Sequence, residues 1–343
     1  MKNKESCSRL NRVGGQAVLE GIMMKAGDNC CTACRLENGE IAVNDRKFIS
    51  VRKKHKWLNI PILRGIINFV EMMILSYSTL TISAEMLGVD EEAEESRAEK
   101  WMKKHLGIKL FDLLMVVALI LGIVLCLGLF IYLPTLAVSG VAALFGVEEL
   151  GIWRAVPEGF LKIAIFILYI YLVSLMPDIR RTFEYHGAEH KSIACFESGV
   201  ELTPENAKKY TRFHPRCGTS FLFVMLFIGI IVSLFIPASL NNILRSLIKL
   251  LLVPFIVGLG YEFILYAGKH PNALTKILSA PGLWMQRLTT REPDEKQLEV
   301  AIVAMKCALS EEFPDFDREK YIKKDDGDTP SDKNETEKGN GAE

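Results

Sequence analysis

The sequence predicts an α-helical polytopic membrane protein with a small N-terminal β-element. Half of the 343 residues are hydrophobic although 24% are charged, so apolar and charged residues must be segregated into separate blocks. Several of the apolar blocks approach the roughly 20 residues that a helix needs to cross a bilayer. Short apolar alternations and an Asn-Gly pair precede these blocks and are typical of a β-hairpin.

Residues 1–60 are expected to form the β-rich element on the cytoplasmic side. The hairpin turn is predicted at Asn38-Gly39, between CTACRL and EIAV. The opening residues are polar and lack the apolar stretch of a secretory leader, so the cysteines are expected to stay reduced. Cys30, Cys31 and Cys34 have no second C-x-x-C pair at a zinc-ribbon spacing. We interpret these three cysteines as incidental.

Residues 61–109 are expected to form an interfacial or re-entrant helix followed by a charged linker. The uncharged core, residues 72–84, is too short to cross a bilayer. Arg64 and Glu71 interrupt the apolar pattern before it. Lysines flank the segment on both sides, so one crossing would place a basic cluster outside, against the positive-inside rule.

Four membrane-spanning helices are predicted, two within residues 110–177 and two within residues 219–268. The first ends near Pro134, the second covers Phe160–Met176, and the third and fourth cover Thr219–Leu244 and Leu250–Gly268. Glu262 lies within the fourth, where an ionisable side chain marks a functional hypothesis by default.

The distribution of basic residues predicts a multi-pass protein of the cell membrane with both ends in the cytoplasm. The 178–218 loop carries Arg180, Arg181, Lys191, Lys208, Lys209, Arg212 and Arg216. By the positive-inside rule this loop is cytoplasmic, whereas the acidic 147–158 connection suits the outer side. Basic residues after the fourth helix place the C-terminus inside as well.

The C-terminal part is expected to contain a cytoplasmic helical segment at 269–315 and a disordered tail at 316–343. Within the former, residues 294–309 form a helix with an apolar face that suits protein partners on the cytoplasmic side. The tail is polar and of low complexity, as in disordered segments. The formal charge is zero, and no nucleic-acid partner is expected beside the lipid bilayer.

One motif in the 178–218 loop is able to carry chemistry. His186, Glu189 and His190 form an H-x-x-E-H pattern, which on a helix places both imidazoles on one face, one turn apart. This is the inverse of the zincin motif and is known from inverzincins, where the imidazoles hold zinc and the carboxylate is the general base. Glu189 is therefore the candidate catalytic residue, and zinc or another divalent ion the candidate cofactor.

A catalytic zinc requires a third protein ligand and an open position. His214 and Cys217 precede the third predicted span, and Glu262 lies about two turns from the cytoplasmic end of the fourth. Glu197 is a weaker candidate. The alternative is that these are ordinary loop residues and that Glu262 is neutralised by a basic residue, with no metal present.

Five stretches of the sequence resemble a known family. They are VGGQAVLEGIMMK, PILRGI, YHGAEHKSIACFESG, LTPENAKKYTRFHPRCGTSF and APGLWMQRLTTREPDEKQLEVAI. The chain resembles the YqhQ-type family of bacterial membrane proteins over roughly residues 11 to 310. The function of that family is unknown, although it is sometimes labelled a predicted metal-dependent enzyme.

The resemblance implies a family pattern at His186, Glu189, His190, His214 and Cys217, but no substrate. Two functions stay open from the sequence. The first is a metal-dependent hydrolase that acts on a peptide bond or a lipid-linked ester at the membrane surface. The second is a non-enzymatic scaffold or regulatory protein in which the histidine loop is structural.

Overall fold

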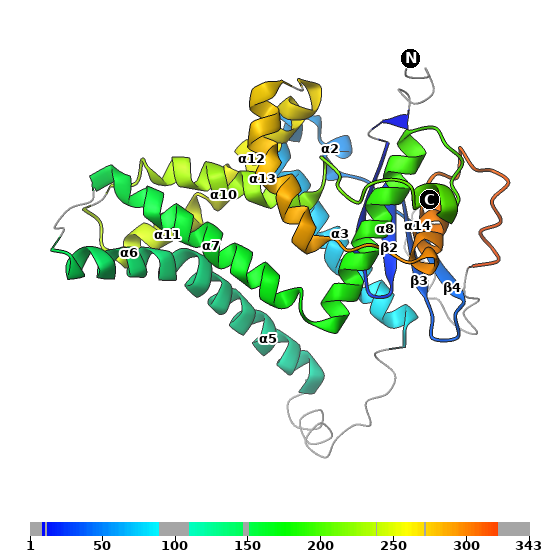
Figure 1. The fold of residues 1–343 in the computed structure, drawn as a ribbon, viewed down its shortest axis with the longest axis horizontal. Helices are drawn as coiled ribbons and strands as arrows, with labels where there is room; N and C mark the ends of the chain where they lie inside the picture. Colours follow the sequence, from blue (N-terminus) through cyan, green and yellow to red (C-terminus); the bar gives the residue numbers. More distant parts are fainter. Residues whose placement is uncertain are drawn as a thin grey trace, which may run out of the picture.

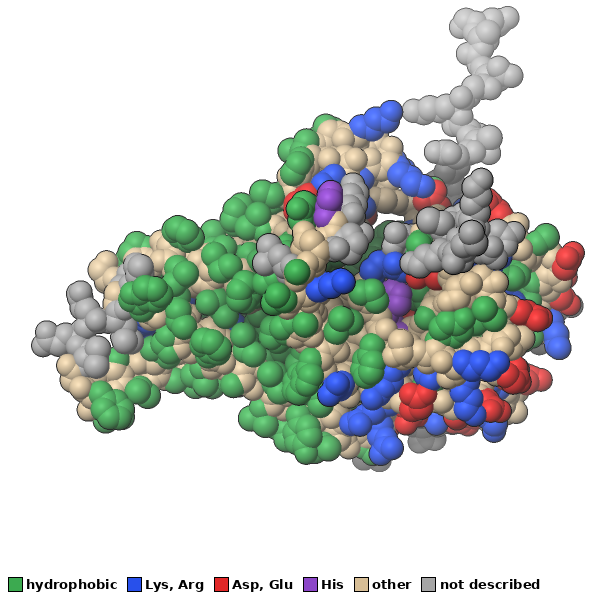
Figure 2. Space-filling model, turned by 45° about the horizontal axis from the view of Figure 1, so that its top comes forward, with side chains coloured by type: hydrophobic (Ala, Val, Ile, Leu, Met, Phe, Trp, Pro, Cys, Tyr) green, Lys and Arg blue, Asp and Glu red, His purple; other side chains and the backbone are tan. Residues whose placement is uncertain are grey.

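The computed structural model describes residues 9–10, 12–88, 110–146, 151–237, 239–270 and 272–321. Figure 1 shows an elongated molecule with a β-sheet and its covering helices at one end and long helices at the other. We call the described residues of 13–86, 177–217 and 290–321 the sheet region, and those of 110–173 and 218–289 the helical region. Hydrophobic side chains cover the helical region and charged ones gather on the sheet region (Figure 2).

The sheet region contains an antiparallel meander in the order β1-β2-β3-β4. The strands are β1 (Val13–Val18), β2 (Gly21–Ala26), β3 (Asn29–Arg35) and β4 (Ile41–Lys47). Gly27 and Gly39 adopt φ values of +60° and +85° in the turns, a conformation that glycine reaches without steric strain. The sheet confirms the small N-terminal β-element and the hairpin predicted at Asn38-Gly39.

Each face of the sheet is covered by helices. Because side chains alternate along a strand, one face packs against α8 (Pro177–Glu197) and α14 (Glu295–Ala308), and the other against α3 (Leu63–Met86). Cys31 lies on the first face, whereas Cys30 and Cys34 lie on the second. The three thiols therefore do not converge, which agrees with the interpretation that they are incidental.

The apolar face predicted for residues 294–309 is present in α14, but it lies inside the protein. Its side chains belong to the main hydrophobic core, together with β2, β3 and α8. Leu298, Ala301 and Met305 are fully buried there. The face that the sequence offered to a partner is thus used by the chain itself.

Helix α3 is a single helix of 24 residues, long and apolar enough to be a candidate membrane span. It extends beyond the short uncharged core expected from the sequence, and two of its charged residues, Arg64 and Glu71, have polar partners. Glu71 accepts hydrogen bonds from the Ser50 hydroxyl (2.8 Å) and the Val51 amide (2.6 Å). Gln16 of β1 donates to Thr79 (2.5 Å), which ties the helix to the sheet.

The remaining helices and turns complete the chain. In the helical region they are α5 (Leu110–Leu127), the short π-helix η2 (Gly128–Tyr132), α6 (Leu133–Leu144), the 3₁₀-helix η3 (Gly151–Arg154), α7 (Ala155–Val173), α10 (Gly218–Ser233), α11 (Asn242–Leu251), α12 (Val253–Lys269) and α13 (Ala273–Thr289). The sheet region adds α2 (Val51–Lys54), η1 (Lys56–Asn59) and α9 (Pro204–Ala207). Residues 89–109, which include the predicted linker, and residues 322–343 of the predicted tail lie outside the described residues. The start of that tail, residues 316–321, is described, and there the Tyr321 carbonyl accepts from the Val43 amide at 2.9 Å.

Three helical stretches are long and apolar enough to cross a membrane, and the count rises to four if a bent pair is one span. They are Leu63–Met86, Val117–Leu144 and Ala155–Val173, and the bent pair is Asn242–Leu251 with Val253–Ala267. The expectation of four spans is thus met only in part, by length and composition, and partly by other segments than predicted.

The differences have local causes. The first predicted span does not end at Pro134. A short π-helix, η2, precedes this proline, which lies at the start of α6, where its missing N–H is tolerated. The third is only the 16-residue α10. Asn241 then caps a new helix, accepting from the Leu244 amide at 2.8 Å, and α11 meets α12 at 45° beside Pro254.

The helical region also buries a group of charged residues that the sequence analysis overlooked. Glu158 of α7 accepts from Arg154 (2.9 Å) and from Lys249 of α11 (2.5 Å), with Arg245 at 3.8 Å. Lys249 also donates to the Thr135 hydroxyl at 2.7 Å. We call these five residues the Glu158 cluster; it joins α6, α7 and α11.

Candidate metal centre

Helix α8 carries the H-x-x-E-H motif and is held tightly between the sheet and the segment that follows α13. Pro177 starts the helix at a position where its missing N–H is not needed. A side chain at Gly187 would lie 2.0 Å from the backbone oxygen of Arg291, so only glycine allows this approach. The helix therefore presents the motif from a fixed position.

Both motif histidines are oriented by backbone carbonyls. His186 Nδ1 lies 2.8 Å from the Thr289 oxygen, and His190 Nδ1 lies 2.5 Å from the Arg212 oxygen. Since a carbonyl accepts only, each Nδ1 carries the proton and each Nε2 has a free lone pair. Metal-binding histidines are typically held in this way. Burial lowers the pKa of His190, which favours the neutral ring that a metal needs.

Cys217 joins the two imidazoles. It is the N-cap of α10, and its Sγ lies 3.2 Å from His186 Nε2 and 3.2 Å from the Thr219 hydroxyl. One ligand atom from each of His186, His190 and Cys217 lies within 4.8 Å of the other two. Tetrahedral zinc with nitrogen and sulfur ligands separates them by about 3.3–3.6 Å. The three residues thus fit a divalent ion after side-chain shifts of about an ångström.

Glu189 is buried beside these residues and faces strand β1. Burial raises the pKa of its carboxyl group to about 7, opposed by nearby His186 and by a hydrogen bond from the Gly15 backbone. Within the described part of the chain, its Oε2 has no hydrogen-bond partner. Gly15 leaves the necessary room, because a side chain there would come within 3.1 Å of the Glu189 Cδ.

Arg180, Arg181 and Lys191, the cations nearest Glu189 in sequence, pair with other residues. Arg180 lies 3.6 Å from Glu184, Arg181 binds Glu20, and Lys191 binds Glu292. The Glu189 carboxyl is therefore not part of a closed ion-pair network among the described residues.

His214 lies next to this group without joining it. Its ring is 5.6 Å from the His190 ring, but its Nε2 accepts from Arg216 at 3.3 Å and lies 3.8 Å from a Glu197 oxygen. Its backbone is held by Gln286, which accepts from the His214 amide (2.8 Å) and donates to its carbonyl (2.7 Å). His214 and the weaker candidate Glu197 thus pair with each other and with Arg216.

Glu262, the remaining predicted ligand, is engaged elsewhere. Its carboxylate forms a two-pronged ion pair with Arg64 of α3, at 2.7 and 2.5 Å. This is the neutralisation by a basic residue that the sequence left as the alternative. Glu262 does not line the cavity beside the histidines.

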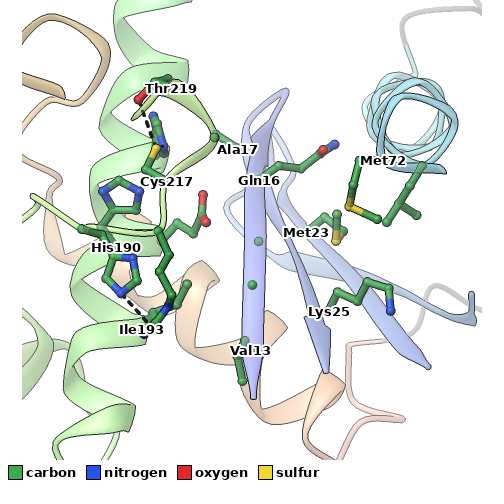
Figure 3. Close-up of a pocket in the computed structure, with 18 of the residues that line it drawn as sticks. Val13, Gln16, Ala17, Met23, Lys25, Met72, His190, Ile193, Cys217 and Thr219 are labelled. Carbon is green, nitrogen blue, oxygen red and sulfur yellow. Dashed lines mark hydrogen bonds between the residues drawn. The ribbon is translucent and has the colours of Figure 1, made fainter. Parts of the chain in front are cut away.

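A cavity of about 740 Å³ opens beside His186, Glu189, His190 and Cys217. Figure 3 shows β1 running between His190 and Cys217 on one side and Met72 of α3 on the other. His214, Leu75 and Leu222 also line it, together with the cations Arg12, Lys25 and Arg216. Its volume is in the usual range for small-molecule and substrate sites.

Several residues that hold the site in place were not predicted from the sequence. Gly15, Gln286 and Thr289 lie in the stretches VGGQAVLEGIMMK and APGLWMQRLTTREPDEKQLEVAI, which were noted only for a family resemblance. Both stretches occur together with the H-x-x-E-H stretch in the family resemblance, and this joint occurrence could have identified the three residues. In the fold, all three lie against α8 or the loop before α10.

Residues 60–311 match the model of a family described as "Protein of unknown function (DUF1385)". The chain belongs to this family. It is also 34% identical over 295 residues to a Bacillus subtilis (strain 168) protein described as "Uncharacterized protein YqhQ", covering 84% of this chain and 89% of that protein. No solved structure matches. The family assignment made from the sequence is confirmed, and no relative's name assigns a metal, a substrate or a reaction.

Proposed function

We propose that the protein is a metal-dependent hydrolase that works at the membrane surface, with zinc held by His186, His190 and Cys217. One observation carries this proposal: two imidazoles fixed through Nδ1 by backbone carbonyls, with both Nε2 atoms turned toward one thiol. The hydrogen bonds to the backbone use only the Nδ1 atoms, so they orient both rings and leave the lone pair of each Nε2 for a metal ion. A bound ion would use them.

Cys217 is the best third ligand of the three that the sequence offered. Its Sγ is already 3.2 Å from His186 Nε2, whereas His214 faces Arg216 and Glu262 faces Arg64. Three protein ligands leave one position of a tetrahedral ion open, as catalytic zinc sites require.

Each residue then has a defined part in hydrolysis. Zinc, when bound, supplies Lewis-acid activation of water and of the scissile carbonyl. Glu189 takes a proton from the attacking water and passes it to the leaving group, which requires a pKa near neutrality. Burial provides that pKa, and the unpartnered Oε2 is able to accept the proton.

The scaffold alternative receives less support. An ion pair between Glu189 and Arg180, Arg181 or Lys191 would have favoured it, but all three cations pair with other acids. It also relied on residues 294–309 as a docking helix, and the apolar face of α14 is buried in the core.

The location of the site fits a catalyst at a membrane face. The charged sheet region adjoins the apolar helical region, and the centre lies where α10 begins (Figures 1 and 2). The basic residues of 178–218 favour the cytoplasmic side, with both chain ends there. That compartment also keeps the Cys217 thiol reduced.

Elemental analysis of the detergent-purified protein tests the proposal. We expect about one zinc per chain and its loss in a His186→Ala/His190→Ala variant, because a single remaining ligand does not retain the ion. The matched control is His55→Ala/His270→Ala, which changes two exposed histidines. Cys217→Ser is expected to weaken zinc binding strongly, and His214→Ala to leave the zinc content unchanged.

Two results would contradict the proposal. One is no bound metal after reconstitution with zinc under reducing conditions. The other is an unchanged zinc content in the His186→Ala/His190→Ala protein. Loss of zinc in His214→Ala but not in Cys217→Ser would instead show that His214, and not Cys217, is the third ligand.

A further inference from the structure

Strand β1 forms one wall of the cavity and is the edge strand of the sheet. It pairs with β2 along its whole length, and no other described strand lies on its outer side. The residues Val13, Gly14, Gly15, Gln16 and Ala17 all line the cavity that holds the metal centre. An edge strand presents unpaired backbone groups, which are a template for a further strand.

The direction of these backbone groups follows from antiparallel pairing. Residues of an edge strand point their N–H and C=O alternately toward the partner strand and away from it. Val18 and Gly21 flank the two-residue β1–β2 turn and pair with each other, so by alternation residue 15 faces away from β2. By alternation the N–H and C=O of Val13 and Ala17 also face outward, on the cavity side.

The two glycines in the middle of β1 have no conformational explanation. Neither has a positive φ, and a glycine weakens a strand. At Gly15 a side chain would come within 2.7 Å of the Met23 carbonyl oxygen, but one added at Gly14 would meet nothing within 4 Å. Glycine within a strand often marks close approach by a ligand or another backbone, and the open space at Gly14 is part of the cavity.

The other walls suit the side chains of an extended peptide. Met23, Met72 and Leu75 supply apolar surface on the α3 side, and Leu222 of α10 supplies it elsewhere. Strand addition obtains affinity from backbone hydrogen bonds and specificity from pockets for alternate side chains. A lipid-linked ester has no repeating N–H and C=O groups to match β1.

We propose that the substrate is an extended peptide that pairs with the outer edge of β1 as a fifth strand. This places one of its peptide bonds beside Glu189 and rests on the proposed hydrolase function. Hydrolysis adds one water: a C–O bond forms at the carbonyl carbon, the C–N bond breaks, and the proton taken by Glu189 goes to the leaving amine. The products are a carboxylate and a free amine.

The test uses the zinc-loaded full chain in detergent and a library of proteome-derived peptides, with cleavage sites read by mass spectrometry. The best-cleaved peptide is then synthesised with one N-methylated amide at each position in turn. Pairing with β1 requires alternate N–H groups, so we expect methylation to lower kcat/KM at least tenfold at every second position and little in between. A response without this two-residue period overturns the inference.

A second variant separates this inference from the proposed function. Gly14→Phe places a side chain in the open space on β1, on the strand face opposite to the one on which a side chain at Gly15 would approach Glu189. Phenylalanine also favours a strand. We expect zinc content to persist while peptide cleavage falls at least tenfold. Ester hydrolysis by the parent protein without any peptide cleavage overturns the peptide inference alone. Absence of zinc overturns both.

Discussion

The two regions of the molecule each bury a polar group of residues, and the two groups are built in opposite ways. In the Glu158 cluster, charged side chains satisfy one another, with Arg154, Arg245 and Lys249 around one carboxylate. In the sheet region, the side chains of His186 and His190 are held by backbone carbonyls, and their Nε2 atoms are left toward Cys217. The side chains of the Glu158 cluster bind one another and hold helices together. The backbone carbonyls, by contrast, leave the Nε2 lone pairs of His186 and His190 unused.

The two buried carboxyl groups show the same contrast. Glu158 is surrounded by cations, while Glu189 has a backbone donor and an oxygen without a hydrogen-bond partner among the described residues. A buried charge stabilises a fold only when it is paired, and otherwise burial costs free energy. Replacing each carboxyl group should therefore have opposite effects on stability.

The largest effect is expected for Glu158→Ala. It leaves Arg154, Arg245 and Lys249 buried without their shared anion, and breaking such a group typically lowers the free energy of unfolding by about 3–5 kcal/mol. Thermal unfolding in detergent measures the loss. Zinc binding by the fraction that remains folded should be unaffected. A stability equal to that of the parent would mean that the Glu158 cluster does not hold the helices.

Glu189→Gln is expected to stabilise the metal-free protein at neutral to alkaline pH. Because burial raises the pKa of Glu189 from 4.5 to about 7, the native protein binds this proton more tightly than the unfolded chain does. The contribution of this group to stability is therefore full below pH 4.5 and is lost as pH rises to about 7. Glutamine does not ionise, so the variant should be more stable than the parent above pH 7, by on the order of 3 kcal/mol.

Unfolding of the two proteins by denaturant at pH 5 and pH 8 checks this prediction. The difference should shrink toward pH 5, and hydrolytic activity should fall about 10²–10⁴-fold in the variant. A variant less stable than its parent at pH 8 would indicate that Glu189 is a structural residue.

A smaller effect is expected for Gln286→Ala, which acts on the loop that carries Cys217. The Gln286 side chain makes hydrogen bonds to the His214 amide, the His214 carbonyl and the Ser220 hydroxyl, at 2.8, 2.7 and 3.0 Å. Their loss should lower stability by about 1–3 kcal/mol and zinc affinity about tenfold. Zinc titration against a chelator measures the affinity, and an unchanged value would show that this loop does not position Cys217.

Much of the fold followed from local patterns. Asn38-Gly39 predicted the β3–β4 turn, and long apolar blocks predicted helices because both signals depend on neighbours in sequence. The boundaries were less accurate where a tertiary contact changed the outcome. Lys249 and Arg245 look like a polar break between spans, but they form the buried face of α11 because Glu158, far away in sequence, neutralises them.

The candidate site was likewise predicted where it depends on neighbours in sequence, and less well where it depends on tertiary contacts. The spacing of His186, Glu189 and His190 was sufficient to place them on one helix face, since that depends only on helical periodicity. The choice among Cys217, His214 and Glu262 depended on which loop approaches α8. Arg64, which pairs with Glu262, lies in a helix that the sequence analysis placed at the membrane interface.

The contact between Gly187 and Arg291 has a consequence for how the protein matures. The carbonyl that orients His186 belongs to Thr289, 103 residues further along the chain. Two residues later, the backbone oxygen of Arg291 closely approaches Gly187. A nascent chain that ends before this segment contains the whole H-x-x-E-H motif yet lacks the support for its first imidazole. If the centre binds the proposed zinc, its loading follows the docking of this C-terminal segment, and an incomplete polypeptide lacks a complete site.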